Sequence, residues 1–330
     1  MKPATRHRLT RTVFAITLAA LTASASLDAG ADDNKVLRVG YQKSGLLAVL
    51  KANGELEQKL KTLGYSVKWF EFPAGPQLLE ALNANSIDFG YTGAPPPVFA
   101  QAGGVRFVYV AAEPGGHGNE ALIVKPDSPL RSVADLKGKR VALQKGSSSN
   151  YLLPELLHKA GLEYADVHPV YLPPADARAA FENGTVDAWV IWGPYFASAQ
   201  QTLKARTIAD NTSVQSAPSF YEATRDFADH QSDIVGAVLA QLRATSQWVN
   251  AHPSQTAELL AAQTGLDHAI VDTWVRRVPY ATSPITDEIA RAQQNVADAF
   301  YGTRLIPQKI VVKANVWTSP EAVASLSAAK

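Results

Sequence analysis

A short polar stretch after an apolar run could bind an anion. Residues 145–150 (KGSSSN) follow the strand-like run 140–143 and precede a helical segment at 151–160. Amides at a helix start have no intrahelical carbonyl to bond, and the helix dipole adds partial positive charge there. With the serine hydroxyls, this stretch predicts an oxyanion site. The same residues are also typical of a helix cap, and Pro154 would remove a backbone bond or delay the helix start.

Strand-like and helical segments alternate along the first half of the chain. Strands are predicted at 36–40, 66–72, 87–91 and 106–112. Helices are predicted from residue 45 to Leu63, at 76–83, and from an opening within residues 92–97 through Ala102. This alternation predicts an α/β fold built from parallel βαβ units. In such sheets, ligands bind beyond the carboxyl ends of the strands. The candidate ligand segments are therefore 42–45, 92–95, 146–150 and 191–194.

The second half repeats this pattern. Residues 39–43 (VGYQK) resemble 141–145 (VALQK), and 87–88 (ID) resemble 186–187 (VD). The distance along the chain between the matching residues differs by only three residues from one match to the other. This agreement favours a duplicated lobe. Asp88 and Asp187, equivalent in the two halves, are expected to support their sheets.

Two segments look like crossovers between lobes, the glycine-rich loop 113–119 and the stretch 217–224. A helix-rich tail follows, and it has no sheet of its own to continue. We therefore expect residues 32–120 and 219–330 to form a discontinuous lobe one and residues 121–218 to form lobe two. A cleft between two such lobes can close on a ligand by a hinge motion.

Few patterns point to catalysis or to a metal. The chain has no cysteine and seven histidines, without an H-E-x-x-H motif, a nucleophile elbow or a phosphate-binding glycine loop. His117 and Glu120 are three residues apart in a glycine-rich loop, which is weak evidence for a metal. We expect no cofactor. Trp189 and Trp192 lie on opposite faces of one predicted strand, so Trp192 is the better candidate to line the cleft.

The N-terminus has the organisation of a secretory signal peptide. Four basic residues precede the apolar run 13–21, and Ala29-Gly30-Ala31 fits a cleavage site, with 23–25 as an earlier alternative. Cleavage after Ala31 leaves 27 basic and 29 acidic residues, a balance that argues against nucleic acid as a partner. We expect residues 1–31 to be removed and the mature protein to be periplasmic.

Several longer strings resemble the aliphatic sulfonate-binding proteins of ABC importers. They are 72–82 (FPAGPQLLEAL), 87–93 (IDFGYTG), 96–102 (PPVFAQA), 135–139 (DLKGK), 170–181 (VYLPPADARAAF) and 187–192 (DAWVIW). The resemblance covers the chain from about residue 36 to about 305. It implies the type II periplasmic binding protein fold, with two α/β lobes, a ligand cleft between them and two crossover segments.

The resemblance also implies a set of site residues. Donors to the sulfonate fall on Gln42, Ser44, Thr92, Gly93, Ser147 and Ser148, and weaker positions near the cleft fall on Asp176 and Trp192. Trp192 and the loop from His117 to Glu120 are expected to meet the alkyl part. Family members often carry an acidic residue where this chain has Ala94, and its loss should ease anion binding or enlarge the pocket.

The implied function is capture of aliphatic sulfonates by a monomeric solute-binding protein without enzymatic activity. Its partners would be a membrane permease and a cytoplasmic ATPase, with no nucleic acid. Taurine, a sulfate ester or nitrate are alternative ligands, and Glu120 or Asp176 could bind the taurine amine. A more distant alternative is an enzyme on the same fold, such as a desulfinase or a pyrimidine-precursor synthase, which the absence of cysteine disfavours.

Overall fold

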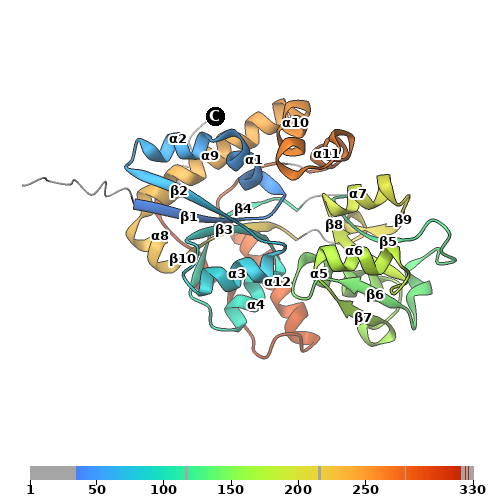
Figure 1. Cartoon of the computed structure of the whole chain (residues 1–330). Coiled ribbons are helices and arrows are strands. Elements are labelled where there is room, and N and C mark those ends of the chain that lie inside the picture. Colours follow the sequence, from blue (N-terminus) through green and yellow to red (C-terminus); the bar gives the residue numbers. More distant parts are fainter. Residues whose placement is uncertain are drawn as a thin grey trace, which may run out of the picture. The chain divides into compact units, whose positions relative to one another are not determined.

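The computed structural model describes residues 35–115, 118–214, 217–278, 280–320, 324 and 326. The predicted signal peptide, residues 1–31, lies outside the described residues. Within the described part of the chain, no helix is both long enough and apolar enough to span a bilayer. The described strands form two separate sheets, and the helices pack around these sheets (Figure 1).

The first sheet has five strands in the order β2-β1-β3-β10-β4. These are β1 (Lys35–Tyr41), β2 (Tyr65–Glu71), β3 (Phe89–Gly93), β4 (Phe107–Glu113) and β10 (Ser219–Thr224). β1 pairs in parallel with β2 and β3, but β10 runs antiparallel to β3 and β4 between them. The expectation of parallel strands is therefore only partly correct, because β10, which follows the whole second sheet in the chain, is inserted antiparallel into the first sheet (Figure 1).

The second sheet has the order β7-β6-β8-β5-β9. Its strands are β5 (Glu120–Val124), β6 (Arg140–Leu143), β7 (His168–Tyr171), β8 (Ala188–Trp192) and β9 (Arg206–Asp210). β5 is antiparallel to β8 and β9, as β10 is to its neighbours in the first sheet. Read in order, each strand of one sheet has a counterpart in the other, so the topology repeats.

The two predicted aspartates occupy equivalent places in this repeat. Asp88 Oδ2 accepts from the backbone N–H of Arg38 at 2.8 Å, and Asp187 Oδ2 accepts from that of Arg140 at 2.7 Å. Each aspartate also forms an ion pair with the same arginine. Asp88 directly precedes β3 and Asp187 directly precedes β8. Each carboxylate therefore ties the start of its strand to the neighbouring strand of the same sheet, as expected.

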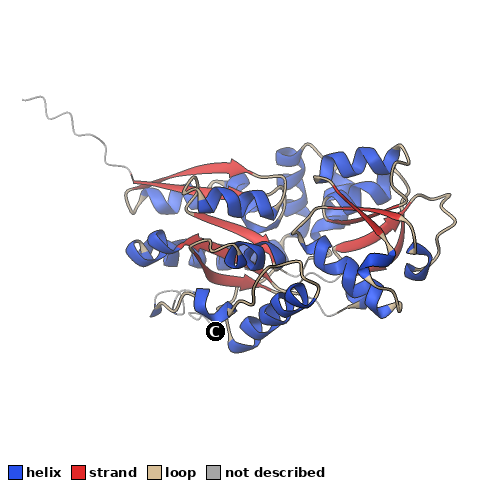
Figure 2. Ribbon diagram, turned by 90° about the horizontal axis from the view of Figure 1, so that it is seen from below, coloured by secondary structure: helices blue, strands red, loops and turns tan. Residues whose placement is uncertain are grey.

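Helices cover both faces of the first sheet (Figure 2). They are α1 (Gly45–Asn53), α2 (Glu55–Lys61), α3 (Gly75–Asn83), α4 (Pro95–Ala102), α8 (Arg225–His230), α9 (Ser232–Ala251), α10 (Pro253–Thr264), α11 (His268–Val275) and α12 (Asp287–Gly302). The single helix predicted from residue 45 to Leu63 is wrong. Gly54 adopts a left-handed conformation with φ 70° and ends α1 before α2 begins.

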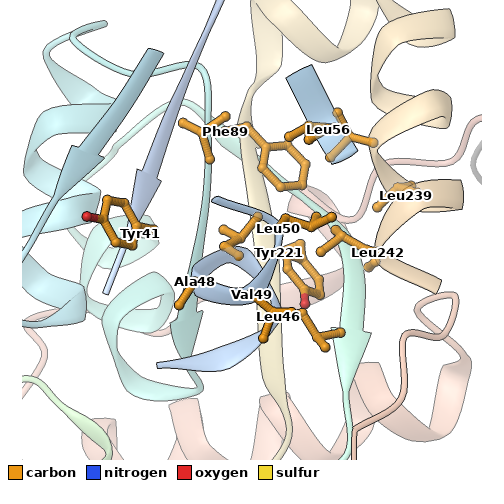
Figure 3. Packing of buried hydrophobic residues seen from close by; sticks show 14 of the residues in the cluster. Tyr41, Leu46, Ala48, Val49, Leu50, Leu56, Phe89, Tyr221, Leu239 and Leu242 are labelled. Atoms are coloured by element: carbon orange, nitrogen blue, oxygen red, sulfur yellow. The ribbon is translucent and has the colours of Figure 1, made fainter. Parts of the chain in front are cut away.

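Alternating residues of β4 separate two apolar clusters. Val108 and Val110 face the cluster under α1, α2 and α9, where Leu50, Phe89, Tyr221 and Leu239 are all buried (Figure 3). Phe107 and Tyr109 face the cluster with α3, α4 and α12. Since side chains alternate across a strand, this separation places one cluster on each face of the sheet.

The second sheet is covered by α5 (Ser148–Lys159), α6 (Pro174–Glu182) and α7 (Tyr195–Thr202). Short 3₁₀ turns lie at Val133–Leu136, Tyr164–Asp166, Asn211–Ser213 and Val312–Asn315. Val190 packs on the side of α5, whereas Trp189 and Ile191 pack on the side of α6 and α7. The chain passes from the end of β4 to the start of β5, and later from β9 back to β10.

Candidate ligand-binding site

One cavity is lined by residues from both sheets and by all four predicted ligand segments. Its lining includes Gln42, Ser44 and Gly45, Gly93 to Pro95, Ser147 and Ser148, and Trp192 with Gly193. These segments follow β1, β3, β6 and β8, so each lies at the carboxyl end of a strand. A Cβ atom placed on Gly93 would lie 3.4 Å from Cβ of Ser148. The end of β3 in the first sheet therefore lies against the start of α5, which packs on the second sheet.

The start of α5 carries the serines that the sequence singled out. Ser147 is the N-cap residue, and its hydroxyl donates to the carbonyl of Gln144 at 2.7 Å. Pro154 lies inside α5, which begins at Ser148, so of the two alternatives given for this proline the delayed helix start is excluded. Asn150 supports the turn, because its Oδ1 accepts from the N–H of Gly146 at 2.9 Å.

Ser148 and Ser149 both donate their hydroxyls to Glu120. Each Oγ lies 2.8 Å from the same carboxylate oxygen, Oε1. Glu120 is the first residue of β5, is 9 % exposed and lines the cavity. Burial raises the pKa of Glu120 to about 7, while the two serine hydrogen bonds lower it. A carboxylate therefore lies immediately beside the predicted anion site.

A second carboxylate reaches the same cavity from the last residue of β4. Glu113 is 2 % exposed, and its Oε2 accepts from the Tyr91 hydroxyl at 2.8 Å. The Tyr221 hydroxyl donates to the other oxygen. Burial raises the pKa of Glu113 to about 7, and these hydrogen bonds lower it. Glu113 and Glu120 thus flank the first passage between the sheets, one from each sheet.

The described residues that line this cavity include two acidic side chains and no lysine, arginine or histidine. The four predicted segments themselves contain only neutral groups at the cavity, as expected. The carboxylates come from β4 and β5 instead. Among the described lining residues, the available donors to an anion are therefore helix-start amides, hydroxyls and amide side chains.

The first sheet contributes Gln42, Ser44 and Gly45 at the start of α1. Ser44 is its N-cap residue, and Gln42 Nε2 donates to the carbonyl of Tyr91 at 3.2 Å. Gly45 has φ +77°, and a Cβ atom there would lie 3.1 Å from the Tyr91 ring. Only glycine meets both requirements, so the α1 amides approach the cavity without an intervening side chain.

Thr92 has a different place from the one predicted. Its side chain is fully buried, does not line the cavity, and donates to Glu222 Oε1 at 2.6 Å. Burial raises the pKa of Glu222 well above its ordinary value, and the hydrogen bond from Thr92 lowers it. The hydroxyl therefore faces the interior of the first sheet, while Gly93 beside it faces the cavity.

The sequence also singled out Asp176, His117 and Ala94, and the outcome differs for each. Asp176 is exposed in the first turn of α6 and does not line this cavity. His117 lies outside the described residues. Ala94 is 2 % exposed and lines the cavity, so its small side chain leaves space beside Gly93.

Aromatic residues form much of the remaining lining. Trp192 is half-buried at the cavity, whereas Trp189 is fully buried with its ring 5.8 Å from that of Phe181. Trp189 therefore belongs to the core, whereas Trp192 packs against the same apolar cluster and also lines the cavity. Trp274 from α11 also lines the cavity, although nothing in its local sequence indicated this.

Further lining residues were not found by sequence reasoning. They include Tyr91, Glu113, Tyr151, Asn211, Ser219, Trp274 and Val278. Glu113 had one available signal, because an acidic residue ends an otherwise apolar strand run. In the described part of the chain, no group of three or more histidine, aspartate or glutamate side chains could hold a metal ion.

Comparison with known proteins places this geometry in a family. The family described as "NMT1/THI5 like" matches residues 64–256. An aliphatic sulfonates-binding protein of Escherichia coli K12 is 41 % identical over 309 residues, which cover 93 % of this chain and 97 % of that protein.

Two solved structures are similar over most of their length. The periplasmic aliphatic sulphonate-binding protein SsuA from Escherichia coli has a TM-score of 0.79 at 42 % identity, covering 86 % of this chain and 92 % of that one. The alkanesulfonate-binding protein SsuA from Xanthomonas axonopodis pv. citri, bound to MOPS, has a TM-score of 0.83 at 40 % identity, covering 86 % and 98 %. The chain therefore belongs to the NMT1/THI5-like family and has the periplasmic binding protein fold.

Proposed function

We propose that this protein is the solute-binding component of an ABC importer and captures aliphatic sulfonates in the cavity between its two sheets. The observation that carries the proposal is the convergence of three helix starts from both sheets on one cavity. α1, α4 and α5 begin at its lining, through Ser44 and Gly45, Ala94 and Pro95, and Ser147 and Ser148. Helix-start amides are suited to an oxyanion.

The polar residues of the lining would hold the sulfonate oxygens. The proposed contacts are Gln42, Ser44, Gly93, Ser147 and Ser148, with Thr92 supporting Gly93 from the interior of the sheet. A sulfonate has three oxygens and a single charge, so several neutral donors can satisfy it without an ion pair. Asp176 is left out of this set because it is exposed on α6.

The aromatic residues of the lining would meet the alkyl part of the ligand. Trp192 from β8 is half-buried at the cavity, and Trp274 from α11 lines the same cavity although it is almost fully buried. Burying an alkyl chain against such surfaces is favourable at roughly 25 cal/mol per Å² of apolar area. His117 belongs to the loop that the sequence assigns to this part of the site.

We infer that residues 32–120 with 219–330 form one lobe, that residues 121–218 form the other, and that the ligand closes them. Contacts between α7 and the α11 region support a connection on one side of the cavity. Gln201 Nε2 donates to the Ala269 carbonyl at 3.0 Å, and Arg277 donates to Gln200 Oε1 at 2.7 Å. Closure would bring both sets of helix starts onto one ligand.

The same proposal includes export and partners. The mature protein would begin after Ala31, act as a periplasmic monomer, and deliver its ligand to a membrane permease driven by a cytoplasmic ATPase. Similarity to periplasmic sulfonate-binding proteins supports this assignment. N-terminal sequencing of the protein from a periplasmic fraction, with size-exclusion chromatography, tests the cleavage site and the monomeric state.

Calorimetric titration of the mature protein with octanesulfonate tests the ligand class. We expect saturable heat and a change in tryptophan fluorescence, because Trp192 and Trp274 line the cavity. Parallel titrations with taurine, nitrate and an alkyl sulfate rank the alternative ligands. Absence of heat and of a thermal shift with every sulfonate would overturn the proposal.

A further inference from the structure

The hydroxyl proton of Ser148 is engaged by a carboxylate. Ser148 Oγ donates to Glu120 Oε1 at 2.8 Å, and Ser149 Oγ donates to the same oxygen at 2.8 Å. A serine hydroxyl has one proton. While Glu120 is ionised, Ser148 can therefore offer only lone pairs to a molecule in the cavity.

A sulfonate at the start of α5 conflicts with an ionised Glu120 in two ways. It needs donors, and the nearest hydroxyl points its proton at the carboxylate. It would also place a second negative charge next to a carboxylate that is itself 9 % exposed. Like charges at short range in a poorly solvated site repel strongly.

No described cation offsets the charge of Glu120. The titratable residues on the elements that pack against β5 are Tyr151, Glu155, His158 and Lys159 on α5 and Arg206 and Asp210 on β9, while β8 carries none. Arg206 donates to the carbonyls of Ser128 and Leu130, and Lys159 donates to that of Ser213. His158 is exposed near the far end of α5.

Across the cavity, the facing titratable residues are Tyr91 and Glu113 from the first sheet. Glu113 is acidic and Tyr91 donates to it, so neither neutralises Glu120. Burial raises the pKa of Glu120 to about 7 before any ligand charge is added. Proton uptake near neutral pH therefore requires little additional free energy.

We propose that Glu120 is a positioning residue that must be protonated when a sulfonate binds at Ser148, so that the protein takes up one proton from solvent with the ligand. The inference rests on the proposed function and deepens it. The sulfonate itself stays ionised over the same pH range, because sulfonic acids are strong acids. The new proton therefore resides on the protein.

The added proton changes which groups donate and accept in the hydrogen bonds between Glu120 and its two serines. The protonated carboxyl of Glu120 donates to one of its two serine oxygens, where previously it only accepted. When that acceptor is Ser148, the Ser148 hydroxyl no longer points at Glu120 and turns its own proton toward a sulfonate oxygen. Ser149, which is fully buried, remains the donor to the other carboxyl oxygen or to Oε1.

Calorimetry of octanesulfonate binding in two buffers of different ionisation enthalpy measures this proton directly. At pH 8 we expect uptake approaching one proton for each ligand bound. Above pH 7.5 the dissociation constant should rise about tenfold for each pH unit, since one coupled proton has that slope. Binding without proton uptake, or with a dissociation constant independent of pH from 6 to 8.5, would overturn the inference.

The variant Glu120→Gln tests whether Glu120 acts through its protonation or has only a structural role. A glutamine can accept from one serine and donate to the other at every pH, so the variant should bind without proton uptake and about thirtyfold more tightly than the parent at pH 8.5. Glu113→Gln is the matched control, because it removes the other cavity carboxylate and should keep the pH slope. If the slope disappears in Glu113→Gln and persists in Glu120→Gln, Glu120 is not the coupled group.

The outcomes also distinguish this inference from the function on which it rests. Failure of the unmodified protein and of Glu120→Gln to bind any sulfonate between pH 5.5 and 8.5 would remove the proposed function. Tight binding at all pH values without proton uptake would remove only the role of Glu120. The buffer comparison needs no variant, so a poorly folded Glu120→Gln would not prevent the decision.

Discussion

Thr92 Oγ1 donates to Glu222 Oε1 across 2.6 Å, and both side chains are fully buried. The two residues lie on the neighbouring antiparallel strands β3 and β10. One precedes the second sheet in the chain and the other follows it. The hydrogen bond therefore joins the two halves of the discontinuous first sheet directly behind Gly93, which lines the cavity.

Thr92→Val should lower stability more than it lowers ligand affinity. Valine keeps the shape but leaves a fully buried glutamate without its hydroxyl partner, a loss of about 1–3 kcal/mol in the free energy of unfolding. Urea unfolding followed by circular dichroism measures this difference. Thr92→Ser retains the hydroxyl and serves as the control. Equal stability of Thr92→Val and the parent protein would show that the hydrogen bond contributes nothing.

Glu113→Gln should change how stability depends on pH. Burial raises the folded-state pKa of Glu113 from 4.5 to about 7, so the folded state binds this proton more tightly than the unfolded state does. Its stabilising effect is complete below about pH 4.5 and is lost as pH rises through about 7. Relative to the variant, the parent should lose about 3 kcal/mol over this range.

Urea unfolding of both proteins at pH 5 and pH 8 checks that prediction. The amide oxygen of the glutamine can accept from one of the two tyrosine hydroxyls and its NH₂ group can donate to the other, so the variant keeps a partner for each hydroxyl but carries no charge. A difference between the two proteins that stays constant with pH would mean that Glu113 does not titrate as its burial implies.

Gly93→Ala should weaken sulfonate binding at little cost to the fold. The added Cβ atom lies 3.4 Å from Cβ of Ser148, an ordinary contact, and it occupies the junction between the two sheets at the cavity. We expect the dissociation constant to rise about tenfold, equivalent to about 1.4 kcal/mol, with nearly unchanged thermal unfolding.

Gly302→Ala is the matched control for that substitution, because a Cβ atom there meets nothing within 4 Å. It lies at the end of α12, far along the chain from the cavity segments. Titration of both variants with the same sulfonate compares them. Unchanged affinity in Gly93→Ala would argue against a ligand between Gly93 and Ser148.

Gly193→Ala should disturb the fold itself. A Cβ atom there would lie 2.4 Å from Trp274 Cδ1 and 2.4 Å from Asn119 Oδ1, so a side chain or the backbone must move. Such overpacking typically costs about 1–3 kcal/mol. We expect a lower unfolding temperature and an altered tryptophan emission spectrum before any ligand is added, and a spectrum identical to the parent's would contradict the close contact.

Local patterns in the sequence were sufficient for several elements of the fold. The strand predicted at 140–143 matches β6. The repeat between Asp88 and Asp187 was also visible, because equivalent strands carry equivalent side chains. These features depend on residues close in sequence, where periodicity, helix stops and strand ends act directly.

Other features depend on which strands become neighbours. β10 inserts antiparallel between β3 and β4, and this pairing directs the Thr92 hydroxyl to Glu222 and away from the cavity. The break at Gly54 is decided similarly, since a glycine within a helical pattern can continue a helix or end it. The tertiary fold selected the left-handed alternative.

The candidate site shows the same division. The sequence by itself predicted four candidate ligand segments at the ends of strands, and Gln42, Gly93, Ser148 and Trp192 from these segments line one cavity in the structure. Only the tertiary structure brought Glu113 to that cavity from the first sheet, whereas Glu120, which the sequence had already assigned to the site, reaches it from the second sheet. The spacing of Glu113 from the serines along the chain did not predict that they line one cavity. Their meeting depends on the order of strands in two different sheets.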